Sequence, residues 1–563
     1  MWLSCDFETL ATKECIEKGY TYVWGWGSYH LETDTFLYGN SIDNFFETIY
    51  NNYKLEGEID LYFHNLKFDG SFILNWLENN GYNYVEKINK SCKAKKVYTT
   101  LVSGLGTFYN ITFYYKFLKL SIKNSLNLIN RSVAQIAKSL KLDTLKGEID
   151  YTLHREENHC LSNEEIEYLK NDVVIVAKGL YETFFKKGMD KMTVGSNALA
   201  YFKKNTKNYT YFFPQLNKPE DTLIREAYRG GYVYINKPSY ASFLEINKKG
   251  CVYDFNSMYP SVMLKYPLPL FYPIRFEGKP DGTKNLAYVI KLECKFKLKE
   301  GLNVIPTIQI KNSLLYDPNE YITDSGCFVE LTLTHIDFYH MLRNYDVQIR
   351  RYIGGYYFHS KRGIFDNYIN EFAKLKQECK GVDEGGYMLA KLLMNSLTGK
   401  FATSPKNDIK IPYLYDGVLG FKTEISEKNT EYIPVTTFIT AYARHELFTT
   451  IYKNFNNFLY CDTDSVHLSC PKEEAVIENI HKTKFGCWDC EFEFNRARYI
   501  KPKCYYEENE NENERVIKTA GLSHKYAQEL DWNSFRLGTC LQVLKPKQVK
   551  GGVVLVKSVF EIK

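Results

Sequence analysis

The feature that most constrains the fold is the regular change between strand-like and helical segments over the first 190 residues. Runs rich in Tyr, Val, Ile and Phe, such as YTYVWGW, IDLYFHN and TFYNITFYY, alternate there with segments of helical periodicity. This alternation is typical of α/β domains, in which helices cover a sheet. We therefore expect an α/β domain over residues 1–190 and, because the chain has 563 residues, further domains after it.

The composition excludes global disorder but does not show which kind of molecule the protein binds. Hydrophobic residues make up 44% and charged residues 25% of the chain, which is close to the globular average. The formal net charge is only +5, so any nucleic-acid role requires local basic surfaces. The aromatic fraction of 16% is high, and the extra Tyr residues either stack on bases or reflect compositional bias.

The N-terminal segment and the cysteines favour a soluble intracellular protein. Charged residues in MWLSCDFETL interrupt the apolar stretch that a signal peptide needs, and no later segment resembles a membrane span. The 14 cysteines are scattered, which favours reduced thiols. Cys487 and Cys490 form one CxxC pair, but a zinc site generally needs two such pairs. We expect these to be ordinary core or surface thiols.

The first group of candidate functional residues is acidic and lies in the N-terminal third. Asp6 and Glu8 are two residues apart in LSCDFET, so a strand would point both carboxylates to one face, where they could hold a divalent cation. Asn65 and Asp69 follow the apolar run LYFHN, and we expect them in a polar turn at the end of a strand. Either feature alone also fits an ordinary solvent-facing strand or loop.

A predicted helix adds the remaining groups. In EEIEYLKNDVVIVAKGL, Tyr168 and Asp172 are four residues apart, beside a buried stripe of Val173, Val176, Ala177 and Leu180. The carboxylate could bind metal while the phenol orients a water, and Lys146 could contact a phosphate. Several acids with a positioned water are the requirements of two-metal phosphodiester hydrolysis.

These segments resemble a known family. DFET, HNLKFDG and YLKND, in this order, are similar to the three exonuclease motifs of proofreading family B DNA polymerases. The resemblance implies metal ligands at Asp6, Glu8, Asp69 and Asp172, and implies that Asn65, Phe68, Ser125 and Leu126 hold a single-stranded primer end. Glu148 either reaches a metal or lies in a surface loop.

A second group of residues lies downstream. GCVYDFNSMYPSVML predicts a strand that ends at Asp254 and turns into a helix. FLYCDTDSVHL predicts a hairpin with Asp462 and Asp464 at its tip, where crowded like charges are most easily tolerated beside a cation. Between them, a helix would carry Lys391, Asn395 and Thr398 on one face. A stripe of Lys and amide residues is usually a solvated face, but Leu and Met would enclose Lys391 and make it a fixed cation poised for a triphosphate.

These three segments resemble motifs A, B and C of the family B polymerases, and the resemblance covers nearly the whole chain. The resemblance implies metal binding by Asp254, the Phe255 carbonyl and Asp464, with Asp462 completing the acidic cluster. It implies nucleotide contacts from Tyr259, Lys376, Lys391, Asn395 and Thr398. Accessory motifs imply DNA contacts from Tyr228, Arg229, Gly230, Gly231, Ser257, Arg444, Lys503 and Tyr505.

The length and two long insertions point to the protein-primed branch of the family, found in small bacteriophages. The resemblance implies an RNase H-like exonuclease domain followed by a right-hand polymerase with two insertions, an α/β plus α+β multidomain architecture. The expected parts are an exonuclease domain at 1–190, palm at 191–265 and 433–525, a first insertion at 266–360, fingers at 361–402, a second insertion at 403–432 and thumb at 526–563.

The resemblance also implies cofactors and partners. Two Mg²⁺ ions per active site are expected, with Mn²⁺ as a substitute. The partners would be primer-template and single-stranded DNA, deoxynucleoside triphosphates and a terminal protein that supplies the first hydroxyl. The protein would act as a monomer, or as a heterodimer with the terminal protein, in the cytoplasm of a bacterial host. It would copy a linear viral genome by processive, strand-displacing synthesis.

Two features limit this interpretation. The family usually has Tyr where Thr398 stands in NSLTGK, so a flat wall against the nascent base pair is lost. The acidic run EENENENE at 507–514 offers nothing to bury and is expected to be a solvated loop without a partner. The alternatives are a nuclease without synthesis, which leaves the second group unexplained, and a non-catalytic DNA-binding protein, which needs no clustered carboxylates.

Overall fold

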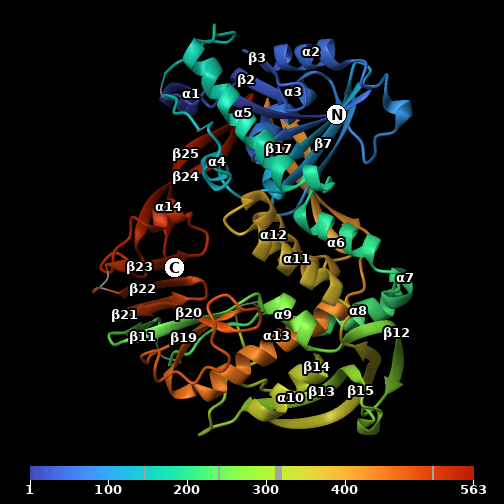
Figure 1. Ribbon diagram of the computed structural model, residues 1–563, viewed down its shortest axis with the longest axis vertical. Helices are drawn as coiled ribbons and strands as arrows, with labels where there is room; N and C mark the ends of the chain where they lie inside the picture. The colour runs from blue at the N-terminus through green and yellow to red at the C-terminus, as the bar shows by residue number, and fades with distance from the viewer. Residues whose placement is uncertain (145, 152, 239–240, 311–319, 510, 512) are drawn as a thin grey trace.

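The N-terminal unit is an eight-stranded mixed sheet covered by helices on both faces (Figure 1). The computed structural model describes residues 1–144, 146–151, 153–238, 241–310, 320–509, 511 and 513–563. The sheet has the order β3-β2-β1-β4-β8-β7-β6-β5. Its strands are β1 (Trp2–Thr9), β2 (Val23–His30), β3 (Thr35–Gly39), β4 (Glu58–Phe63), β5 (Asn83–Tyr84), β6 (Val97–Val102), β7 (Phe108–Tyr115) and β8 (Leu118–Asn124).

The alternation of residues along β1 separates the core from the functional face. Leu3, Cys5 and Phe7 pack with α2 (Ile42–Tyr53) and α3 (Leu66–Asn79) in one apolar core. The even-numbered residues of β1 therefore face the opposite side of the sheet, where α5 (Asn163–Thr183) lies. The short helices α1 (Lys13–Lys18) and α4 (Val133–Ser139) complete the unit, and the α/β expectation is confirmed.

A second sheet forms the centre of the other half of the molecule. It has the order β20-β11-β19-β18-β9, and α9 (Met258–Lys265) and α13 (Pro434–Lys453) join its core. Its strands are β9 (Val233–Ile235), β11 (Gly250–Phe255), β18 (Phe458–Asp462), β19 (Ser465–Leu468) and β20 (Trp488–Phe494). A smaller sheet packs against it through a shared apolar cluster and contains β10 (Leu244–Ile246), β21 (Arg496–Lys501), β22 (Cys504–Asn509) and β23 (Glu514–Thr519).

Two further parts flank this centre. A four-stranded sheet consists of β12 (Leu268–Glu277), β13 (Ala287–Leu298), β14 (Val329–Thr334) and β15 (Tyr345–Lys361), with α10 (His335–Asn344) beside it. The helices α11 (Asp366–Cys379) and α12 (Glu384–Phe401) form an antiparallel pair between the N-terminal sheet and the central sheet (Figure 1). Nearby are α6 (Val194–Asn205), α7 (Tyr209–Phe212) and α8 (Lys218–Ala227).

Two hairpins connect the halves. They are formed by β16 (Lys406–Tyr415) with β17 (Val418–Glu427) and by β24 (Cys540–Val549) with β25 (Gly552–Glu561), the second preceded by α14 (His524–Ala527). Both contact α3: Asn75 donates to the Gly417 carbonyl at 3.0 Å, and Gln548 donates to the Ser71 hydroxyl at 3.0 Å. Gly551 turns the second hairpin at φ 86°, where a β-carbon would lie 2.1 Å from the Thr21 carbonyl oxygen.

Several sequence expectations are corrected by the fold. Asp69 lies in the first turn of α3 rather than in a loop, because the helix begins directly after Asn65, which has a left-handed backbone conformation at φ 69°. The acidic run begins inside β22, and Glu507 is buried, whereas residues 510 and 512 lie outside the described residues. Among the described residues, no helix is both long and apolar enough to span a bilayer.

The expected domain boundaries can be placed on these elements. The boundary near residue 190 falls between the short 3-10 turn Phe185–Lys187 and α6, and the first insertion corresponds to β12–β15. The expected fingers correspond to α11 and α12, the second insertion contains the β16–β17 hairpin and the thumb contains the β24–β25 hairpin. We propose the same division for the folded chain.

Candidate active sites

The first site is a group of carboxylates at the end of β1. Ligand oxygens of Asp6, Glu8 and Asp172 all lie within 4.8 Å of one another. Asp6 and Glu8 share one face of the strand, as their spacing predicts, and Asp172 comes from α5 on the same side. Asp172 Oδ1 is buried without a hydrogen-bond partner among the described residues. Three clustered carboxylates and an unsatisfied oxygen fit a divalent cation that takes oxygen ligands.

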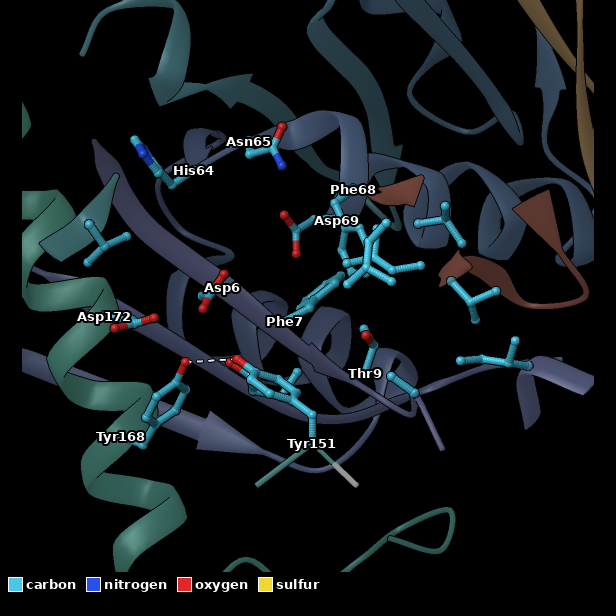
Figure 2. Close-up of a pocket in the computed structure, with 18 of the residues that line it drawn as sticks. Asp6, Phe7, Thr9, His64, Asn65, Phe68, Asp69, Tyr151, Tyr168 and Asp172 are labelled. Carbon is cyan, nitrogen blue, oxygen red and sulfur yellow. Dashed lines mark hydrogen bonds between the residues drawn. The ribbon is translucent and has the colours of Figure 1, made fainter. Parts of the chain in front are cut away.

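Asp69 completes the acidic lining. Figure 2 shows Asp6, Asp69 and Asp172, from three different elements, around one pocket. Asp69 is not among the three residues whose ligand atoms cluster within 4.8 Å, although it lines the same pocket. Glu148, the other predicted ligand, is exposed and belongs to no such group among the described residues. Its surface position corresponds to the loop interpretation.

Burial raises the pKa values of these carboxyl groups. Burial raises the pKa of Glu8 to about 8 and that of Asp69 to about 7. Burial, together with the charges of Asp69 and Glu8, raises the pKa of Asp6 well above its ordinary value. Ionising all of them together is unfavourable without a compensating cation.

Basic and phenolic groups border the acids. Lys146 Nζ lies 2.5 Å from Asp172 Oδ2 and 5.4 Å from the centre of the Tyr168 ring. Tyr168 and Asp172 lie on α5 as predicted, and the Tyr168 hydroxyl is 2.9 Å from that of Tyr151 (Figure 2). Tyr151 could not be predicted from the sequence, because one tyrosine among 47 gives no local signal.

The residues predicted to hold a primer end lie at the rim of the acidic pocket or beneath that rim. Asn65 is exposed and Phe68 is half-buried, and both line the pocket. Leu126 is half-buried. Ser125 is fully buried, and its hydroxyl donates to the Phe63 carbonyl at 3.0 Å. Ser125 therefore supports the end of β4 from below.

The far wall of this pocket comes from the other end of the chain. The cavity has a volume of about 970 Å³, and the β24–β25 hairpin contributes Leu544, Val553, Val554, Leu555, Val556 and Lys557. This apolar wall was not foreseen, because no sequence pattern reports contact between segments so far apart. A pocket with carboxylates on one wall and apolar side chains on the other can take a chain end with bases and phosphates.

The second site lies where β11 meets the β18–β19 hairpin. Asp254 pairs with Ser465 in the strand register, and the Phe255 amide donates to the Asp464 carbonyl at 2.7 Å. Asp462 and Asp464 lie at the hairpin tip, as predicted. The turn residue Thr463 is held at φ 60° and its amide donates to the Tyr232 carbonyl at 2.8 Å.

These carboxylates also crowd one another. Burial and the neighbouring Asp464 charge raise the pKa of Asp254 to about 7. Burial raises the pKa of Asp464 to about 6, and Asp462 adds to the increase. Asp462 itself forms an ion pair with Lys503, whose Nζ is 2.6 Å from Oδ2. The cluster of oxygen donors with raised pKa values suits a divalent cation.

The predicted nucleotide contacts surround this cluster with different exposures. Lys391 and Asn395 are exposed on α12, so the expectation that Leu and Met enclose Lys391 is wrong. Those apolar residues point to the other side of α12, into the core. Burial and the charge of Lys391 lower the pKa of Lys376, which is half-buried on α11. The two lysines are therefore close enough to interact electrostatically. A pair of neighbouring cations suits an anionic triphosphate.

Thr398 and Tyr259, two residues predicted to contact the nucleotide, are buried to different degrees. Thr398 is only 4% exposed, and its hydroxyl has no partner among the described residues. Tyr259 is half-buried, and burial raises its pKa to about 12. Ser257 occupies the N-cap position of α9 at φ 57°, and its side chain makes no capping hydrogen bond.

The two predicted DNA-binding arginines lie inside the protein. Arg444 is 5% exposed, forms a bidentate pair with Asp337 at 2.8 and 2.9 Å, and donates to the carbonyls of Arg229 and Gly230. Arg229 is also buried and donates to the carbonyls of Ala227 and Thr332. Their guanidinium groups thus fix the backbone of the YRGG segment, which leaves Tyr228, Gly230 and Gly231 partly or fully accessible.

Tyr505 and the cysteines of the CxxC pair lie in or beside apolar cores. Tyr505 is half-buried and packs against Tyr460 and His467. Cys487 is buried and Cys490 is half-buried. None of them belongs to a metal-spaced group within the described part of the chain.

The fold and the two acidic sites together define a polymerase with a separate nuclease domain. The family model for DNA polymerase type B, organellar and viral, matches residues 51–164 and 152–483. The chain is 38% identical to the DNA polymerase of Bacillus phage B103, covering 100% of this chain and 99% of that protein. It is 31% identical to the DNA polymerase of Streptococcus phage Cp-1, covering 99% and 98%.

Solved structures agree over the whole length. Phi29 DNA polymerase in an orthorhombic crystal form matches with a TM-score of 0.90 at 36% identity, covering 100% of both chains. The structure of phi29 DNA polymerase complexed with single-stranded DNA matches with a TM-score of 0.87 at 35% identity, again covering 100% of both chains. The chain belongs to the type B DNA polymerases of organelles and viruses. It is a DNA-directed DNA polymerase that carries a 3′–5′ exonuclease, so neither the nuclease without synthesis nor the non-catalytic binding protein describes it.

Proposed function

We propose that the chain extends a primer at the Asp254, Asp462 and Asp464 cluster and removes misplaced primer ends at the Asp6, Glu8, Asp69 and Asp172 cluster. The observation that carries this division of labour is the presence of two acidic clusters on two separate sheets, one largely buried and one half-buried. Raised carboxyl pKa values in a cleft are typical of functional sites. The family relation supplies the two reaction types.

The donor sets fit divalent cations in both places. Asp254, Asp464 and the Phe255 carbonyl would hold Mg²⁺ or Mn²⁺ in the synthetic site, and Asp6, Glu8, Asp69 and Asp172 would hold it in the nuclease site. When bound, such ions stabilise negative charge on the reacting phosphate oxygens.

The side chains of the synthetic site have distinct tasks. Lys376 and Lys391 neutralise the triphosphate of the incoming nucleotide, with Asn395 beside them on α12. Tyr259 packs beneath the sugar and excludes a 2′-hydroxyl. Tyr228, Gly230, Gly231, Lys503 and Tyr505 contact primer-template DNA through phosphates and stacking. The crystallised relative phi29 DNA polymerase, which was solved with primer-template DNA and incoming nucleotide, supports these partners.

The nuclease site holds a single-stranded end. The pocket walls formed by Phe68 and the β24–β25 hairpin hold the bases, and Lys146 neutralises the scissile phosphate beside Asp172. Tyr168, supported by Tyr151, orients the attacking water.

Primer extension on a primed single-stranded circle with Mg²⁺ and all four nucleotides tests the two assignments. We expect the wild type to make products longer than the circle, Asp464→Ala only to degrade the primer, and Asp69→Ala only to extend it. Degradation by the wild type at every nucleotide concentration would contradict the synthetic assignment. Normal degradation by Asp69→Ala would contradict the nuclease assignment.

We further propose that synthesis begins on a protein hydroxyl, with the β12–β15 sheet as the docking region for that protein. Full-length similarity to phage polymerases supports this proposal. The test uses extract from phage-infected cells, a linear template and one radiolabelled nucleotide. Label that depends on the polymerase and becomes acid-soluble only after protease treatment supports protein priming. Label that stays entirely in protease-resistant DNA contradicts it.

A further inference from the structure

A buried carboxylate lies beneath the synthetic site. Glu507 on β22 is 1% exposed, although the acidic segment around it predicts a solvated loop. Its oxygen Oε1 lies 2.5 Å from Nδ1 of His467 and accepts a hydrogen bond of 2.6 Å from the Tyr499 hydroxyl. A buried carboxylate is costly unless partners satisfy it, so this arrangement requires a reason.

The imidazole of His467 and the hydroxyl of Tyr499 are the hydrogen-bonding groups at this carboxylate oxygen. His467 is also 1% exposed. Among the described residues, no Lys or Arg forms an ion pair with Glu507, and the nearby cations pair elsewhere: Arg496 with Glu508, Arg498 with Glu245, and Lys503 with Asp462. A carboxylate hydrogen-bonded to one ring nitrogen fixes the orientation of the ring, as it does for metal-binding and catalytic histidines.

His467 belongs to β19 of the catalytic hairpin, and the other side of its ring faces the turn of that hairpin. His467 Nε2 lies 3.4 Å from the Ser465 hydroxyl, and this hydroxyl donates to the Asp462 carbonyl at 3.3 Å. Ser465 directly follows Asp464 in β19. Three contacts therefore lead from Glu507 on one sheet to the turn that carries both aspartates on the other.

The same segment of chain holds the hairpin a second time. Lys503, just before β22, pairs with the Asp462 carboxylate, and its amide donates to the Tyr460 hydroxyl at 3.1 Å. The Tyr460 ring packs 4.9 Å from the His467 ring. The segment from Lys503 to Glu507 thus contacts the hairpin both from the solvent side and from within the core.

We propose that Glu507 and His467 are positioning residues for DNA synthesis: the column Glu507, His467 and Ser465 holds the hairpin so that Asp462 and Asp464 keep their place despite their mutual repulsion. Neither residue touches substrate. The inference rests on the proposed synthetic role of Asp254 and Asp464, and it adds a specific support that neither the sequence motifs nor the comparisons indicate.

The test compares Glu507→Gln with Glu508→Gln. Both remove one negative charge from β22 without changing side-chain size, but Glu508 pairs with Arg496 and has no contact with the hairpin among the described residues. For Glu507→Gln we expect kcat for primer extension to fall about 10-fold to 100-fold, the usual range for a residue that orients a metal site. The Mg²⁺ concentration for half-maximal synthesis should rise, whereas the KM for nucleotides should stay within about two-fold. Glu508→Gln should leave all three values near wild type.

Exonuclease activity on single-stranded DNA serves as the folding control, because it uses the other sheet. It should be unchanged in both variants. If Glu507→Gln lowers only the melting temperature, while kcat and the Mg²⁺ requirement measured below that temperature equal those of wild type, the residue is merely structural and the proposal is wrong.

A milder variant keeps the test decisive if Glu507→Gln does not fold. Tyr499→Phe removes one of the two hydrogen bonds to Glu507 and is expected to lower kcat about three-fold, with a smaller rise in the Mg²⁺ requirement. Unchanged synthesis in Tyr499→Phe would then contradict the proposal. Asp464→Ala distinguishes the proposed function from the positioning role: if it abolishes synthesis while Glu507→Gln keeps the kcat and the Mg²⁺ requirement of wild type, the synthetic site is right and the positioning role is wrong.

Discussion

Gly231 lies so close to Thr463 that a β-carbon on the glycine would come within 2.4 Å of the threonine hydroxyl oxygen. Gly231 belongs to the YRGG segment, and Thr463 separates the two aspartates of the catalytic hairpin. The backbone around Gly231 is fixed by Arg444, which donates to the carbonyls of Arg229 and Gly230. A proposed DNA-binding segment and the catalytic turn are therefore in direct contact.

Gly231→Ala is expected to lower primer extension at least about 10-fold, because the new methyl group displaces Thr463 and with it Asp462 and Asp464. Exonuclease activity should be retained. The double variant Gly231→Ala with Thr463→Gly removes the clashing side chain and also suits the φ of 60° at position 463, so it should recover much of the activity. Steady-state extension assays measure both effects. Equal activity of the single and double variants would contradict the steric explanation.

The folded nuclease site should be more stable at low pH than at high pH when no metal is bound. Burial raises the pKa of Glu8 to about 8, so the group stabilises the fold while it is protonated, and this contribution is lost as the pH rises through about 8. Glu8→Gln should therefore raise the melting temperature at pH 9 in EDTA by several degrees and change it little at pH 4.

Glu32→Gln is the matched control, because Glu32 is exposed in the same domain. It should change the melting temperature little at either pH. Calorimetry across this range checks the result. A melting-temperature difference between Glu8→Gln and wild type that is the same at pH 4 and pH 9 would show that ionisation of Glu8 does not cost stability.

DNA synthesis should need more metal as the pH falls. The pKa of Asp254 is raised to about 7 and that of Asp464 to about 6, and a divalent cation binds the deprotonated forms. Between pH 8 and pH 6 we expect the Mg²⁺ concentration for half-maximal extension to rise about 10-fold or more, and saturating Mg²⁺ to recover most of the rate. An identical Mg²⁺ requirement at both pH values would contradict this protonation scheme.

Thr398 offers a test of nucleotide selection. Its hydroxyl is buried and has no partner in the part of the chain that the structure describes, and the resemblance to the family implies Tyr at this position. We expect Thr398→Tyr to change the KM for nucleotides without abolishing synthesis, because the larger ring would form a wall beside the nascent base pair.

Thr398→Val keeps the side-chain volume and removes the unsatisfied hydroxyl. It should therefore leave the free energy of unfolding unchanged or raise it by about 1 kcal/mol. Unchanged kinetics of Thr398→Tyr with all four nucleotides would exclude a role at this position.

Local spacing by itself determined much of both sites. The two-residue period of a strand placed Asp6 and Glu8 on one face, and the four-residue spacing of a helix placed Tyr168 beside Asp172. The pattern of FLYCDTDSVHL placed two aspartates at a hairpin tip. These predictions hold because each depends only on backbone geometry within a few residues.

Only the tertiary structure decided which polar groups are buried and what they contact. An acidic segment predicted a solvated loop, yet the packing of the smaller sheet on the central one buries Glu507 against His467. Arg444, predicted to contact DNA, lies inside against Asp337, and Leu555 from the C-terminal hairpin faces the acids of the N-terminal domain. The first two of these contacts join residues 40 and 107 positions apart, and the third joins opposite ends of the chain. Burial depends on what covers a strand, which the strand's own sequence does not contain.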